Sequence, residues 1–146
     1  MRNVLFICLA VGVSLTPLAA EEPDDAKTLQ GIWIPVKAEL GGQRMPDAVL
    51  KTITLKLNNS EYEVSIAGEG GPDKGTWTLD TAAKPKGMKI TGVKGPNAGK
   101  VFPAIYELKS DVLRVCYDLS GAKRPAEFKT NPGTQLYLVT YNRKKK

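Results

Sequence analysis

The sequence contains no histidine, and only two of its 146 residues are cysteines. Without imidazole, the chain has no ordinary Ser-His or Cys-His nucleophile pair, no histidine metal ligand and no side chain whose unperturbed pKa lies near neutrality. Its longest apolar run, at the N-terminus, is shorter than the ~20 residues that a membrane-spanning helix needs. We therefore expect a protein that is not an enzyme and that uses no metal and no other cofactor.

Residues 1–20 have the pattern of a secretory signal peptide. Arg2 supplies a positive charge, an apolar stretch covers residues 4–15, and small residues end at Ala20 before the acidic Glu21. We expect cleavage after Ala20, and a periplasmic or extracellular product with no transmembrane span. An uncleaved membrane anchor is the alternative, but the apolar stretch is too short to favour it.

The remaining chain has the length of one domain. We predict a polar, flexible leader over residues 21–28, a folded domain over 29–143 and a basic tail over 144–146. Cleavage removes Cys8 with the signal, so Cys116 has no partner for an intramolecular disulfide. The folded domain, which we expect to be a monomer, must then be stabilised by its core alone.

The predicted domain shows about eight short runs of alternating or β-branched apolar residues, separated by Gly, Pro, Asn and Asp. This pattern predicts an all-β fold, an antiparallel up-and-down barrel of about eight strands. The stretch from Met45 to Lys51 is the segment that favours one short helix, which could serve as a lid or plug.

Two hairpins have alternation clear enough to predict their register. The first joins residues 52–57 to 61–66 through a turn at Asn59-Ser60, although a turn shifted by one residue would keep the same faces together. The second joins 101–108 to 112–118. The predicted cross-strand pairs are Leu57–Tyr62, Leu55–Val64, Ile53–Ile66, Leu108–Leu113, Tyr106–Val115, Ala104–Tyr117 and Glu107–Arg114.

Large aromatic side chains are predicted on the inner faces of these strands. An eight-stranded barrel can be filled by its own side chains or can hold one small ligand, and the sequence leaves both possibilities open. The candidate ligand-binding residues are Tyr62, Trp77, Tyr106 and Tyr117.

Several short motifs follow one another in a characteristic order. They include Leu29-Gln30-Gly31-Ile32-Trp33, Asp73-Lys74-Gly75-Thr76, Gly95-Pro96-Asn97-Ala98-Gly99-Lys100, Leu113-Arg114-Val115-Cys116-Tyr117 and Arg124-Pro125-Ala126-Glu127-Phe128. This ordered set resembles a family of exported lipocalin-like domains of unknown function that is abundant in planctomycete bacteria. The resemblance covers nearly all of residues 29–143 and implies the fold and export, but no activity.

Gly31 and Trp33 are also similar to the Gly-x-Trp motif that opens lipocalin barrels, in which a late arginine packs over the tryptophan. The resemblance implies structural roles for these two residues and for Arg143 as that arginine. The inner face of the first strand stays open, because the alternate positions of 32–36 are apolar as well. Either one set faces outward, or Pro35 marks a β-bulge.

Three further features of the sequence could have a function of their own. Cys116, two residues from Arg114, could be a reactive thiol, but a small buried side chain is the favoured interpretation. The acids of the leader, including Asp24 and Asp25, are predicted to be too mobile for acid-base catalysis. The connection over 119–134 is unusually long, so it needs a function or local packing of its own.

These observations favour an exported, non-catalytic barrel that binds a small, mostly apolar molecule in its interior. The alternative is an envelope protein-interaction or polyanion-binding module whose barrel is filled and whose loops or basic end hold a macromolecule. No specific nucleic-acid binding is expected, because the lysines and aromatics form no base-stacking series. The volume of the barrel interior distinguishes the two hypotheses.

Overall fold

The computed structural model describes residues 24–146, so the predicted signal peptide, its cleavage site and the start of the predicted leader lie outside the described residues. This part of the chain forms two short helices and nine strands. In chain order they are α1 (Asp25–Thr28), β1 (Gly31–Leu40), β2 (Gln43–Arg44), α2 (Asp47–Leu50), β3 (Ile53–Asn58), β4 (Glu61–Ile66), β5 (Asp73–Asp80), β6 (Gly87–Lys94), β7 (Val101–Lys109), β8 (Val112–Asp118) and β9 (Leu136–Arg143).

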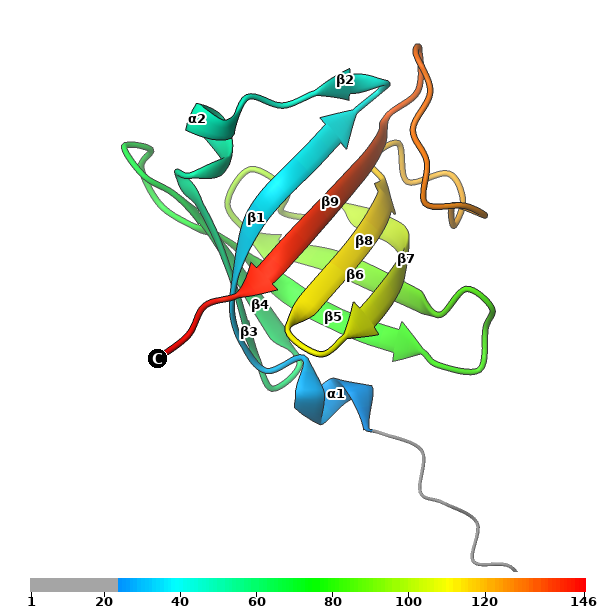
Figure 1. Cartoon of the computed structure of the whole chain (residues 1–146), viewed down its shortest axis with the longest axis horizontal. Coiled ribbons are helices and arrows are strands. Elements are labelled where there is room, and N and C mark those ends of the chain that lie inside the picture. Colours follow the sequence, from blue (N-terminus) through cyan, green and yellow to red (C-terminus); the bar gives the residue numbers. More distant parts are fainter. Residues whose placement is uncertain (1–23) are drawn as a thin grey trace, which may run out of the picture.

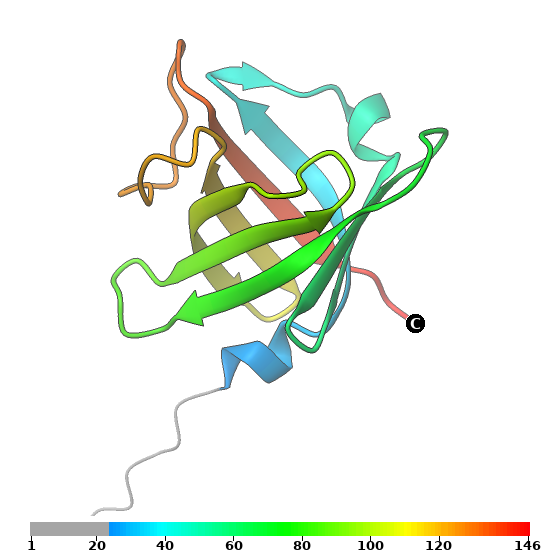
Figure 2. The same ribbon diagram turned by 180° about the vertical axis from the view of Figure 1, so that it is seen from behind.

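The strands form a closed antiparallel barrel. β1 and β3 to β9 follow one another in sequence order around it, and β9 returns to pair with β1, which closes the sheet. β1, β8 and β9 form one wall and β5 and β6 the opposite wall, as the two views show (Figures 1 and 2). The predicted all-β, lipocalin-like up-and-down barrel of eight strands is confirmed, with β2 as a two-residue addition to β1.

The predicted registers of both hairpins are confirmed. Each of the seven predicted cross-strand pairs is present, and the turns lie where the alternation placed them. Asn59 and Ser110, at the two tips, have φ values of 54° and 51°. Asn visits this left-handed region more readily than most residues, which helps to fix the first turn.

The inner face of β1 carries Trp33, which is fully buried. The register against β9 shifts between Pro35 and Lys37, so Val36 is an extra residue that bulges outward and is 46% exposed. Both open possibilities are therefore realised: the set containing Trp33 faces inward, and a bulge follows Pro35.

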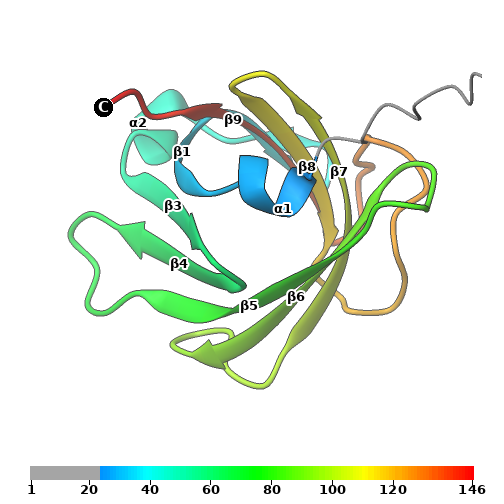
Figure 3. The same ribbon diagram turned by 90° about the horizontal axis from the view of Figure 1, so that it is seen from below.

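Helix α1 corrects the prediction of a flexible leader for residues 25–28. Asp24 caps this helix by accepting hydrogen bonds from the backbone N–H groups of Ala26 and Lys27. The following Leu29 is fully buried, and the helix lies across one end of the barrel (Figure 3). Burial of Leu29 and Asp25 holds the segment in place, which its polar composition did not indicate. We call this end of the barrel the closed end.

Helix α2 lies within the stretch predicted to be helical, at the opposite end of the barrel (Figure 1). Its Leu50 is buried in the core, and the preceding Met45 packs against the core from the loop. None of the helices within residues 24–146 has the length and apolar character needed to cross a bilayer.

The long connection over 119–134 packs on the outside of the barrel. Asp118 anchors its start by accepting hydrogen bonds from Ser120 and from the backbone of Lys123. The Phe128 ring lies beneath the Arg114 guanidinium, with 4.2 Å from Cζ to the ring centroid. The connection therefore has local packing of its own, one of the two explanations that its length required.

Candidate functional site

The half of the barrel away from α1 encloses a cavity of about 660 Å³. Its walls are mainly apolar and come from β3, β4 and β6 to β9. The apolar wall residues include Leu55, Leu57, Val64, Ile90, Phe102 and Val115. At one end the lining residues are exposed, namely Glu69, Gly71, Pro96 and Lys100. This end, the mouth, lies between the loops opposite the closed end. The volume falls within the ~300–1,000 Å³ that is usual for small-molecule sites.

Strand alternation explains why the walls are apolar. In β3, Leu55 and Leu57 are buried and line the cavity, whereas Lys56 between them is exposed on the outer face. The same period places Val64 inward on β4, opposite Leu55. The cavity is thus bounded by regular backbone, and its shape is set by the sizes of the inward side chains.

Three tyrosines from β8 and β9 form a polar cluster on one wall. The hydroxyls of Tyr117 and Tyr141 lie 3.1 Å apart, and the Tyr117 ring stacks on that of Tyr137 at 5.8 Å between centroids. All three residues line the cavity. Burial raises the pKa of each of these phenols, so they stay protonated at physiological pH.

A second polar group lies at the mouth. The Asp73 carboxylate accepts hydrogen bonds from the Tyr62 hydroxyl at 3.2 Å and from the Asn97 side chain at 2.9 Å. A Cβ atom at Gly75 would lie 2.6 Å from the Tyr62 ring, so only glycine leaves room for that ring against β5. Burial and the Asp73 charge raise the pKa of Tyr62.

The closed end of the interior is filled. Trp33 donates its indole N–H to the Leu29 carbonyl at 2.9 Å, and Trp77 donates to the Glu61 carbonyl at 3.1 Å. Trp33 and Leu29 are fully buried and Trp77 is 4% exposed. These large rings, with their N–H groups satisfied, fill the interior beneath α1. A second pocket, of about 750 Å³, lies beside the helix, between it and the β5–β6 connection.

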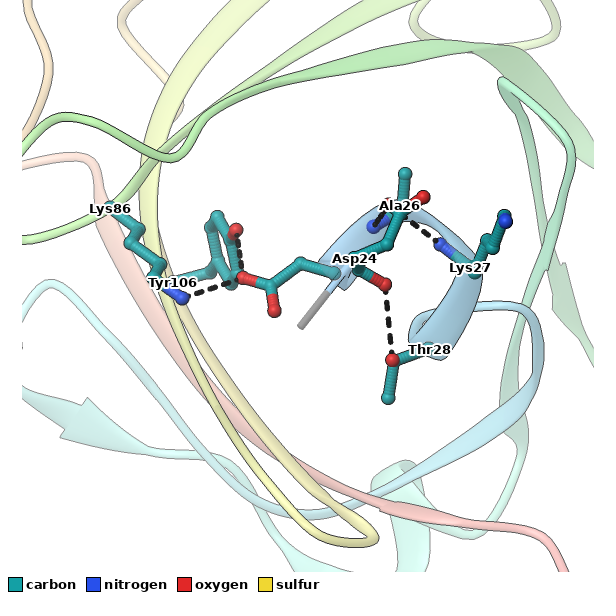
Figure 4. Close-up of polar contacts among 7 residues, drawn as sticks. Asp24, Ala26, Lys27, Thr28, Lys86 and Tyr106 are labelled. Carbon is teal, nitrogen blue, oxygen red and sulfur yellow. Dashed lines mark hydrogen bonds and ion pairs between the residues drawn. The ribbon is translucent and has the colours of Figure 1, made fainter. Parts of the chain in front are cut away.

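A buried carboxylate connects α1 to the barrel. Asp25, only 6% exposed, accepts hydrogen bonds from the Tyr106 hydroxyl at 2.6 Å and from Lys86 at 2.8 Å. Figure 4 shows the Lys86 and Tyr106 side chains, whose dashed lines end at one carboxylate. Burial alone would raise the pKa of Asp25, but these hydrogen bonds and the Lys86 charge lower it below its ordinary value. Burial and the Asp25 carboxylate raise the pKa of Tyr106.

Arg143 closes the barrel over Trp33, as the lipocalin resemblance implied. Its guanidinium lies 4.3 Å from the Trp33 ring centroid. It also donates to the carbonyls of Gln30 and Thr28, each at 2.6 Å, and to Asp111 at 2.9 Å. One side chain therefore joins β9, the start of β1 and the end of α1.

The four candidate ligand-binding residues lie in two different parts of the barrel interior. Tyr62 and Tyr117 line the cavity, whereas Trp77 and Tyr106 belong to the filled end. The sequence analysis missed Tyr137 and Tyr141, although their spacing of four within β9 places both on the inner face. It also missed Asp25, because composition alone assigned that residue to a mobile leader.

Cys116, the candidate reactive thiol, does not line the cavity. Cys116 is fully buried on the outer side of β8, where its thiol faces the Lys129 carbonyl at 3.8 Å, and burial raises its pKa. A buried thiol with a raised pKa is a poor nucleophile. Within residues 24–146, no group of three or more His, Cys, Asp or Glu side chains could hold a metal ion.

No family model, curated protein or solved structure matches this chain. The class of protein is therefore defined by its own fold and cavity. It is a small all-β protein, a lipocalin-like barrel that is filled at one end and hollow at the other.

Proposed function

We propose that this protein binds a small, mostly apolar molecule in the cavity of its barrel. The observation that carries the proposal is a volume of about 660 Å³ enclosed mainly by Leu, Ile, Val, Met and Phe side chains. Dense packing is the rule in protein interiors, so a space of this size calls for an occupant. The filled-barrel alternative describes only the closed end.

The groups at the mouth also support a binding role. Asp73, Asn97 and Lys100 surround the mouth, while the interior beyond them offers apolar surface and tyrosine hydroxyls. Apolar walls with a few fixed polar groups are typical of sites that bury a ligand and orient it. Export, a non-catalytic role and membership of the planctomycete family stay predictions. An intact mass that matches residues 21–146 would support export with cleavage at the predicted site.

The test is a fluorescence titration with N-phenyl-1-naphthylamine, an uncharged apolar probe. Its own emission is the readout, because Trp33 and Trp77 do not line the cavity. We expect saturable one-to-one binding that persists at high salt, since salt screens exposed charges and leaves apolar burial intact. Binding that disappears at high salt would favour the polyanion-binding alternative.

A cavity-filling variant is the matched control. Val64 lines the cavity and is half-buried, so Val64→Phe adds a ring where there is space. We expect it to weaken probe binding by about tenfold or more while the protein stays folded. Unchanged affinity would place the probe elsewhere on the molecule and would contradict the proposal.

A further inference from the structure

The cavity holds a hydrogen-bond donor that its own walls do not use. Tyr117 and Tyr141 bring two hydroxyl protons to one contact of 3.1 Å, and only one of these protons can lie between the two oxygens. Within residues 24–146, neither hydroxyl makes another hydrogen bond. One O–H is therefore available to an acceptor inside the cavity.

The hydroxyls of Tyr117 and Tyr141 keep their protons and so stay able to donate a hydrogen bond. Burial raises the pKa of Tyr117 and Tyr141, so neither phenol ionises at physiological pH. A ligand that approaches the pair meets an uncharged O–H group, polarised by the hydrogen bond that its oxygen accepts. Such a group favours a carbonyl or ether oxygen.

Charge at the mouth does not favour an anionic ligand. The charged residues that line the cavity are Glu69, Asp73 and Lys100, and all three lie at the mouth. Two carboxylates thus accompany one ammonium group, and among residues 24–146 no cation lines the walls deeper inside. Burying a carboxylate without a cation is costly, so a fatty-acid anion could not bring its charge to the tyrosine pair.

We propose that the ligand is an uncharged, mostly apolar molecule whose acceptor oxygen, such as that of a ketone, ester or quinone, is bound by the Tyr117–Tyr141 hydroxyl pair. This inference rests on the proposed function, because it names the chemical class of ligand for the same cavity. It predicts weaker binding of fatty-acid anions, whose carboxylate would have to stay at the mouth, near Glu69 and Asp73 as well as Lys100. The stacked ring of Tyr137 beside the pair adds a flat aromatic surface to this part of the site.

The first experiment compares 2-undecanone with undecanoate as competitors of N-phenyl-1-naphthylamine at pH 8. The two competitors have equal chain lengths and differ in charge. We expect the ketone to displace the probe at a concentration about tenfold lower than undecanoate does, because the anion loses hydration without gaining a cation. Equal or stronger competition by undecanoate overturns the inference.

The second experiment removes the donors. The double change Tyr117→Phe and Tyr141→Phe should lower the affinity for 2-undecanone about tenfold, which corresponds to the loss of one hydrogen bond. It should leave the affinity for N-phenyl-1-naphthylamine unchanged. Each single change should cost less, because the remaining hydroxyl can turn to the ligand. Tyr106→Phe is the matched control and should leave the affinity for 2-undecanone unchanged, since Tyr106 does not line the cavity and its hydroxyl bonds to Asp25. Wild-type affinity of the double variant for the ketone overturns the inference.

A measurement on the unaltered protein shows whether the ketone oxygen is hydrogen-bonded in the cavity, even if the double variant does not fold. The carbonyl stretch of bound, isotope-labelled 2-undecanone should lie below its frequency in hexane, because hydrogen bonding weakens the C=O bond. An unshifted band contradicts the inference. If N-phenyl-1-naphthylamine itself fails to bind, the proposed function fails, whereas probe binding without a preference for the ketone refutes the ligand class alone.

Discussion

The two ends of this barrel use the same strands in different ways. At the closed end, Trp33 and Trp77 fill the interior and α1 covers it. At the other end, the inward residues of β3, β4 and β6 to β9 enclose about 660 Å³. The sheet is continuous through both ends, so the difference lies in side-chain size and in the helix, not in the backbone architecture.

This difference separates the task of stabilising the fold from the task of holding a ligand. The closed end combines buried rings, a buried carboxylate and the Arg143 contacts that join β9 to β1 and α1. A protein without an intramolecular disulfide in its described part gains most of its stability from such packing. The hollow end can then give up dense packing without loss of the fold.

The largest contrast should come from removing a ring at each end. Trp33→Ala should lower the free energy of unfolding by about 3–5 kcal/mol, because it empties a fully buried site. Tyr137→Ala removes a half-buried ring that already borders open volume, and we expect less than half of that loss. Urea unfolding measures both values, and equal losses would mean that the two ends are equally important for stability.

Adding a ring should show the reverse contrast. Leu29→Phe places a ring beside the fully buried Trp33 at the closed end and should cost about 1–3 kcal/mol. Val64→Phe places the same ring in the cavity, where we expect a change within about 0.5 kcal/mol together with loss of probe binding. A large destabilisation by Val64→Phe in thermal denaturation would mean that the cavity collapses in solution.

Coupling between Arg143 and Trp33 tests how the closed end is held. We expect about 0.5–2 kcal/mol of interaction free energy between the guanidinium and the ring. Arg143→Ala should cost more than that in total, since it also removes hydrogen bonds to Gln30 and Thr28. The double-mutant cycle with Trp33→Phe isolates the pair, and Lys145→Ala controls for charge. A cycle that closes to zero would leave the hydrogen bonds to Gln30, Thr28 and Asp111 as the contribution of Arg143.

The smallest expected effect depends on pH. The pKa of Asp25 is lower in the folded protein than in the unfolded chain, so its contribution is present above the unfolded pKa and is lost as the pH falls through the folded one. Asp25→Asn should therefore cost about 1 kcal/mol at pH 7 and progressively less below about pH 4.

Urea unfolding at a series of pH values measures this difference. The control is Asp24→Asn, which changes an exposed neighbour that bonds to neither Lys86 nor Tyr106 and keeps a side chain able to cap α1. A cost of Asp25→Asn that stays constant from pH 7 to pH 3 would contradict the assignment of an ionised carboxylate.

The features that depend on the alternation of inward and outward residues in strands could be predicted from the sequence. The faces of Leu57 and Tyr62 and of Glu107 and Arg114 followed from the period of two. Their exact pairing depended on the turn residues, because a turn shifted by one residue keeps the faces but changes the pairs. The position of Arg143 over Trp33 followed from a resemblance, and the structure confirms it.

The candidate site was predictable only in part. Tyr62, Trp77, Tyr106 and Tyr117 share an inward direction, but alternation gives no position along the barrel axis, so it could not separate cavity residues from filling residues. Asp25 was missed because its burial depends on Lys86 and Tyr106, which are distant in sequence. The free volume itself depends on how inward side chains from many strands fit together, which no single strand reveals.

Strand β9 leaves the barrel beside the start of β1, and Lys144 still donates its backbone N–H to the Ile32 carbonyl at 2.8 Å. Helix α1 lies at the same end, so both ends of the described chain emerge opposite the mouth (Figure 1). A protein attached to a sensor surface or a bead through Lys146 would stand with its mouth toward the solution. Attachment at this end of the described chain therefore leaves the mouth unobstructed.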